Sequence, residues 1–123
     1  MSTEAQQIQE FEEVLNTFKE MLHLTDEIMI RLYTTFFKTG VGTLEKLKDA
    51  ISKEEYDAIK FNAHSIKGSA SSVCYGAISE IAETIEKKAE LQERYDYENA
   101  FKELVAQFDK AQGNYALWTR KRD

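Results

Sequence analysis

Apolar residues recur every three or four positions along most of the chain, a spacing that predicts amphipathic helices. The first stripe predicts a helix from about residue 4 to 23, and Thr3 and Gln6 are spaced as a capping box at its start. The last stripe predicts a helix that Asp96 caps. The two stripes consist of Ile8, Phe11, Leu15, Phe18 and Leu22, and of Phe101, Leu104, Phe108, Ala111, Tyr115 and Trp118.

Two more stripes predict helices in the middle of the chain. Thr25 is placed to cap the first of these helices, and Gly40 and Gly42 are positions where it could bend or break. The second follows an irregular stretch at residues 73–75. The apolar positions are Ile28, Leu32, Phe36, Leu44, Leu47 and Ile51 in the first, and Ile78, Ile81, Ala82, Ile85 and Ala89 in the second.

The remaining helix is predicted from the capping-box pattern at residues 52–55, so it should begin near Lys53 and continue through His64 to about Ser71. At about 100° per residue, one side of this helix is apolar, with Ile59, Ile66, Ala70 and Val73. His64 lies on the opposite, solvent-facing side. The residues within about 60° of it are Asp57, Lys60, Phe61, Lys67, Gly68 and Ser71.

The chain of 123 residues contains no proline, and its predicted connections are short, which favours antiparallel helices. We therefore predict a single all-α domain spanning 1–123, in which the last four helices form an antiparallel bundle and the first lies across one end as a cap. Cys74 is the only cysteine, so no intrachain disulfide is possible. We see no leader peptide and no apolar run long enough to cross a bilayer, so we expect a soluble, cytoplasmic protein.

The charge balance argues against nucleic acid as a partner. The chain has 16 basic and 22 acidic residues, a net charge of −6, and its basic residues cluster only at Arg120, Lys121 and Arg122.

The chemistry that the His64 face could support is phosphoryl transfer. Neutral imidazole is a nitrogen nucleophile, and cations at Lys60 and Lys67 would repel a proton from it and attract phosphoryl oxygens. A glycine inside a helix lowers helix stability by about 1 kcal/mol relative to alanine. Its presence at position 68, beside His64, therefore indicates that a partner must approach closely there. The alternatives are an ordinary surface histidine, solvated lysines and a glycine needed for helix packing.

The run His64-Ser65-Ile66-Lys67-Gly68-Ser69-Ala70 resembles the motif of histidine-phosphotransfer (HPt) domains, His-x-x-Lys-Gly followed by small residues. The resemblance extends through residues 82–86 and covers about residues 53–90. It implies that His64 is the phosphoacceptor, that Lys67 neutralises the phosphate and that Gly68 gives a receiver domain access. One departure is Cys74, which stands where many members have glycine, with Gly76 two positions later.

The resemblance also implies a role and partners. Such a domain takes a phosphoryl group from the aspartyl phosphate of one receiver domain and passes it to another, so response regulators and a hybrid histidine kinase are the expected partners. No cofactor is expected on this chain, and Mg²⁺ would be bound by the receiver. The chain shows no Gly-rich nucleotide loop, so we predict a phosphocarrier without kinase activity of its own.

A relay partner needs an exposed apolar patch near the reacting atom. Phe61 flanks His64, and Val14 and Met21 lie off the first helix's core stripe, so these three are predicted docking residues; Val14 and Met21 could instead widen that stripe. Lys60 and Ser71 are secondary site candidates. We expect a monomer.

Two other functions are weighed against the relay. A helical module that binds a signalling partner without phosphate is the main alternative. Glu20 and His23 have the spacing of a di-iron ligand pair, but the signal occurs once where such sites need two copies, so we expect no metal site.

Overall fold

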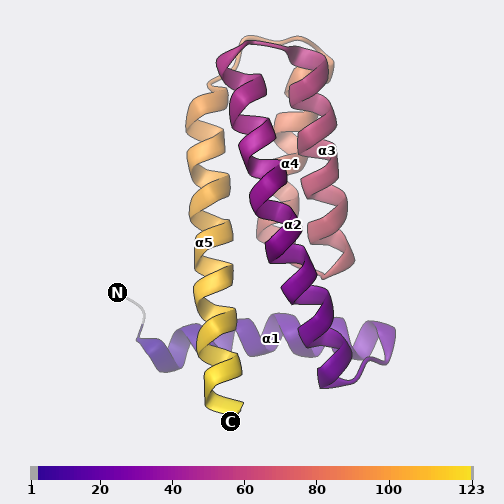
Figure 1. Cartoon of the computed structure of the whole chain (residues 1–123), viewed down its shortest axis with the longest axis vertical. Coiled ribbons are helices and arrows are strands. Elements are labelled where there is room, and N and C mark those ends of the chain that lie inside the picture. Colours follow the sequence, from indigo (N-terminus) through magenta and orange to yellow (C-terminus); the bar gives the residue numbers. More distant parts are fainter. Residues whose placement is uncertain (1–2, 123) are drawn as a thin grey trace.

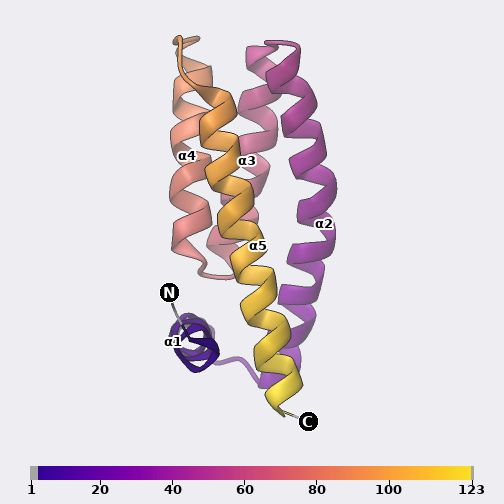
Figure 2. The ribbon, with the colours of Figure 1, turned by 90° about the vertical axis from the view of Figure 1, so that its left-hand side faces the viewer.

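The computed structural model describes residues 3–122, and within them it contains five α-helices and no strand. Four helices lie side by side, each antiparallel to the next along the chain, and the N-terminal helix crosses one end of this bundle (Figures 1 and 2). The predicted all-α architecture is therefore confirmed. The helices are α1 (Glu4–Leu22), α2 (Asp26–Ser52), α3 (Tyr56–Ser72), α4 (Gly76–Glu90) and α5 (Tyr97–Arg122).

Aromatic rings from three helices meet where α1 crosses the bundle. The Phe11 ring centroid lies 5.4 Å from that of Tyr33 and 6.5 Å from that of Trp118, and the Tyr33 and Tyr115 rings stack at 5.9 Å. The buried Tyr33 hydroxyl donates a hydrogen bond to the Val73 carbonyl at 2.7 Å. Burying a large apolar side chain contributes about 1.5–3 kcal/mol, so this cluster fixes the cap helix firmly against the bundle.

The predicted caps of three helices are confirmed. The Thr3 side chain and the Gln6 side chain form a reciprocal capping box, and Thr25 accepts a hydrogen bond from the Ile28 amide at 3.3 Å. Asp96 accepts one from the Asn99 amide at 3.0 Å at the start of α5. These bonds satisfy amide groups that have no partner inside the helix.

The predicted core stripe of α2 is wrong in its first turns. Ile28 and Leu32 are 43% and 40% exposed, and Met29 and Tyr33 are buried instead. The reason is tertiary, because Tyr33 packs against rings of α1 and so sets which face of α2 is turned inward. Leu22, predicted to belong to the α1 stripe, is also exposed.

The two glycines of α2 do not interrupt it. The helix continues through Gly40 and Gly42 to Ser52. A Cβ at Gly40 would lie 2.6 Å from Cε2 of Phe108, so glycine here lets α5 pack closely against α2. At Gly42 a Cβ would meet nothing within 4 Å.

The predicted start of α3 at a capping box near Lys53 is wrong, because α2 occupies that segment. The Ser52 hydroxyl bonds back to the Asp49 carbonyl at 2.8 Å, and α3 begins only at Tyr56. Glu54 has a left-handed backbone with φ 54°, and the Glu55 amide donates to the Ala50 carbonyl at 3.1 Å. These are the features of a Schellman motif, which ends a helix by bonding its last free carbonyls.

A second Schellman motif ends α3, and it explains the departure at Cys74. Cys74 has φ 59°, and its amide and that of Tyr75 donate to the carbonyls of Ser71 and Ala70. This left-handed position is one that glycine occupies with least strain, and here cysteine adopts it. The turn that follows reverses the chain, so α4 runs back along α3.

Candidate functional site

His64 lies in the middle of α3 on the face turned away from the core. Its side chain is 66% exposed, while Ala63 and Ile66 beside it are buried. The predicted orientation of His64 is therefore confirmed.

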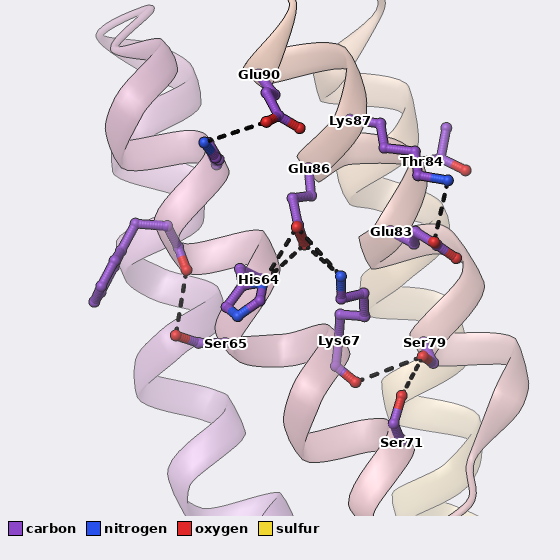
Figure 3. Close-up of polar contacts among 12 residues, drawn as sticks. His64, Ser65, Lys67, Ser71, Ser79, Glu83, Thr84, Glu86, Lys87 and Glu90 are labelled. Atoms are coloured by element: carbon purple, nitrogen blue, oxygen red, sulfur yellow. Dashed lines mark hydrogen bonds and ion pairs between the residues drawn. The ribbon is translucent and has the colours of Figure 1, made fainter.

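A carboxylate of α4 connects His64 to Lys67. Nδ1 of His64 lies 3.1 Å from both carboxylate oxygens of Glu86, and Nζ of Lys67 lies 3.0 and 3.2 Å from the same two oxygens. Figure 3 shows Glu86 reaching between the imidazole and the ammonium group. Because the Glu86 side chain is only 13% exposed, little water competes for these bonds.

These contacts decide which nitrogen of His64 is free. Burial is the largest single effect and raises the pKa of Glu86, but the hydrogen bonds and Coulombic interactions with Lys67 and His64 together lower it more, so the net effect is a pKa below the usual value. The group is therefore ionised near neutral pH and can only accept hydrogen bonds. The proton of a neutral imidazole must then lie on Nδ1, which leaves the lone pair on Nε2. That nitrogen points away from Glu86 in Figure 3.

Both predicted cations are engaged by α4 rather than free. Lys67 is bound to Glu86, and Nζ of Lys60 lies 3.6 Å from Glu90. Lys60 and Lys67 were expected to repel a proton from His64 and to attract phosphoryl oxygens, but the charged group in contact with the ring is the Glu86 carboxylate.

Gly68 and Ser71 lie in different surroundings. A Cβ at Gly68 would meet nothing within 4 Å, so helix packing does not require glycine at this exposed position, and the packing alternative fails. The Ser71 hydroxyl lies 2.7 Å from that of Ser79 on α4, and Ser79 reaches the Lys67 carbonyl at 3.5 Å. Ser71 thus joins α3 to α4 beyond the Glu86 cluster.

The three predicted docking residues also differ in exposure. Phe61 and Met21 are 70% and 65% exposed, whereas Val14 packs against the core and lines a small cavity with Phe11 and Tyr75. Sequence periodicity placed Ile28 and Leu32 in the core, so it missed these two exposed apolar residues.

Glu86 is the main site residue that the sequence analysis missed. The buried stripe of α4 contains Ala82, Ile85 and Ala89, and Glu86 is one position beyond Ile85, at the edge of that stripe. A carboxylate at the edge of an apolar stripe needs a donor on the neighbouring helix, which is the signal that could have found it.

The sequence model of the Hpt domain family matches residues 31–111, more than half of the chain. The chain belongs to the Hpt domain family. Hpt domains act in phosphorelays as phosphocarriers and not as kinases, and they interact there with receiver domains and kinases.

The fold of this Hpt protein resembles the crystal structure of histidine-containing phosphotransfer protein B from Pseudomonas aeruginosa PAO1. The TM-score is 0.75 at 22% sequence identity, and the match covers 90% of this chain and 93% of that one. No curated protein matches the chain.

Two other features were also considered from the sequence, a metal site at Glu20 and His23 and a membrane-spanning segment. His23 ends α1 in a left-handed conformation with φ 53°, and residues 3–122 contain no group of three or more His, Cys, Asp or Glu residues that could hold a metal ion. Within the same described range, no helix is long and apolar enough to span a membrane.

Proposed function

We propose that Nε2 of His64 accepts a phosphoryl group from a receiver-domain aspartyl phosphate and passes it to a receiver domain of a response regulator. The observation that supports this is the exposed imidazole whose Nδ1 is bound by Glu86, which leaves Nε2 as the nucleophile. Its lone pair attacks phosphorus, and the bond to the aspartyl oxygen breaks with its electron pair leaving on the carboxylate. The proton stays on Nδ1, where Glu86 balances the charge of the phosphorylated ring.

Lys67 has a second role in this proposal. A phosphoryl group brings negative charge beside an ammonium that already lies within one helical turn. Lys67 can turn from Glu86 toward the phosphoryl oxygens, and Glu86 then keeps its bond to His64. The transition state needs positioning and charge neutralisation, which these three side chains supply without a cofactor on this chain. The receiver is expected to supply Mg²⁺.

The approach of the receiver is proposed to use the open surface around His64. Gly68 offers no side chain, and Phe61 and Met21 offer exposed apolar area for a small, transient interface. Lys60 and Ser71 are left with supporting roles on α3. The protein is proposed to act as a monomer, because one exposed histidine on a closed bundle needs no second subunit. The receiver domain of a hybrid histidine kinase is the proposed phosphoryl source.

The test is phosphoryl uptake from a panel of phosphorylated receiver domains. His64→Gln should abolish uptake, while His23→Gln, which changes the other histidine, should leave it intact. The bound phosphate should be labile in acid and stable in base, unlike phosphate on Ser69, Ser71 or Ser72. Unchanged uptake by His64→Gln would reject the relay, and partner binding without any phosphate uptake would support the interaction module instead.

A further inference from the structure

A cavity lies at the end of the bundle opposite α1. It measures about 560 Å³, and the connection between α2 and α3 and the connection between α4 and α5 both contribute to it. These two connections lie at the same end in Figure 1. Its lining includes Tyr56, Tyr95, Tyr97, Glu54, Glu98 and Arg94. Small-molecule sites usually measure about 300–1,000 Å³, so its size suits a small ligand.

Three tyrosine residues are among those that line the cavity. The Tyr97 ring makes edge contacts with Tyr56 at 6.2 Å and with Tyr95 at 5.3 Å between centroids. Tyr97 is only 8% exposed, and its hydroxyl donates to the Glu93 carbonyl at 2.9 Å, which fixes this ring. The Tyr97 ring is therefore already held in place without a ligand.

The charged groups around the tyrosines are mostly negative. Three carboxylates line the cavity against one guanidinium, that of Arg94. Asp96 also caps α5, whereas the side chains of Glu54, Glu98 and Arg94 make no ion pair with any residue in the described part of the chain. Burial raises the pKa of Tyr97, and the nearby Tyr56, Glu93 and Tyr95 raise it further, so another negative charge is disfavoured here.

One ammonium group already rests on this cluster. Nζ of Lys88 lies 5.7 Å from the centroid of the Tyr95 ring, while Glu93 holds it at 2.9 Å. Tyrosine faces attract cations through the ring quadrupole, and recognition of quaternary ammonium groups by several such rings is a common use of this interaction.

We propose that this tyrosine-lined cavity binds a small organic cation with an ammonium or quaternary ammonium head group. The head group lies against the tyrosine rings, and Glu54 and Glu98 balance its charge at the rim. Arg94 opposes binding through like charge. The site is separate from the phosphoryl-transfer surface, because Tyr56 precedes His64 by two helical turns, a rise of about 12 Å.

The test uses choline as the probe and its neutral isostere 3,3-dimethylbutan-1-ol as the control ligand. Titrations of the full chain followed by NMR should give saturable choline shifts confined to residues that line the cavity, and the isostere should give much weaker ones. Glu98→Gln should weaken choline binding about two- to fivefold, and Arg94→Gln should tighten it by a similar factor. Glu103→Gln, an exposed acid of α5 outside the cavity, should change nothing.

The two opposite charge variants keep the test independent of folding. A loss of structure could explain weaker binding in Glu98→Gln, but it cannot explain tighter binding in Arg94→Gln. Equal shifts with choline and the isostere, no saturable shifts, or equal effects of Glu98→Gln and Glu103→Gln would each overturn the proposal.

Discussion

Replacing Glu86 with glutamine tests how the site prepares His64 for reaction. The substitution keeps the size of the side chain but removes its charge. The amide of the variant accepts hydrogen bonds only through its oxygen, and its NH₂ group can donate to Nδ1, which would move the imidazole proton to Nε2. A ring protonated at Nε2 has no lone pair there to attack phosphorus, so we expect Glu86→Gln to slow phosphoryl uptake.

The size of the effect follows from the exposure of the partners. Hydrogen bonds to charged groups contribute about 1.5–3 kcal/mol when buried. Glu86 is mostly buried, but His64 is 66% exposed, so solvent screening reduces the contribution at the ring to about 1 kcal/mol. A loss of about 1 kcal/mol of transition-state stabilisation would slow phosphoryl uptake about fivefold.

The assay combines transfer kinetics with the nitrogen NMR signals of the imidazole. In the natural sequence the neutral ring should show an unprotonated Nε2, and in Glu86→Gln this signal should shift toward the protonated form as the rate falls. Glu83→Gln is the matched control, because Glu83 lies one turn earlier on α4 and, among the described residues, forms an ion pair only with exposed Lys87 at 3.2 Å. An unchanged tautomer and rate in Glu86→Gln, or an equal change in Glu83→Gln, would refute the reasoning.

The same residue predicts a pH dependence of stability. Since the folded state lowers the pKa of Glu86, its carboxylate stabilises the fold above the ordinary carboxyl pKa. This contribution is lost as the pH falls through the lower pKa of the folded state. The stability difference between the natural sequence and Glu86→Gln should therefore shrink below about pH 4, measured by denaturant unfolding at several pH values. A difference that stayed constant into strong acid would contradict this linkage.

Five further substitutions, at four positions, test helix packing, backbone conformation and access at Gly68. Gly40→Ala should lower the unfolding free energy by about 1–3 kcal/mol in denaturant titrations, because its Cβ would collide with the Phe108 ring, whereas Gly42→Ala should be neutral or stabilising. Gln92→Gly should raise the free energy of unfolding by about 0.5–1 kcal/mol, because exposed Gln92 has a left-handed backbone with φ 53°, which glycine adopts without strain. A lower melting temperature of this variant would count against the expectation. Gly68→Ala should stabilise α3 by up to about 1 kcal/mol, and Gly68→Gln should slow transfer from a receiver domain while the helix stays folded; unchanged transfer would show that access at Gly68 does not matter.

Much of the fold could be predicted because each helix carries its own apolar period and three of the five helices carry their own N-terminal cap. Thr3, Thr25 and Asp96 act within one turn of themselves, so local sequence is sufficient for them. The start of α3 was predicted wrongly because the same residues fit both a helix start and a helix end. Ser52 had the pattern of a helix start, yet a left-handed Glu54 closes the preceding helix there, and nothing in residues 52–55 alone decides between the two.

The site was predictable only as far as it lies on one helix. His64, Lys67 and Gly68 share a face of α3 whatever else the chain does, because their spacing fixes it. Glu86 comes 22 residues after His64, and its contact depends on the reversal at Cys74 and on the register of α4 against α3. That register is set by which apolar side chains of the two helices interdigitate, a property of the packed pair rather than of either sequence. The nucleophile can therefore be named from the sequence, whereas the group that selects its reactive nitrogen requires the packed structure.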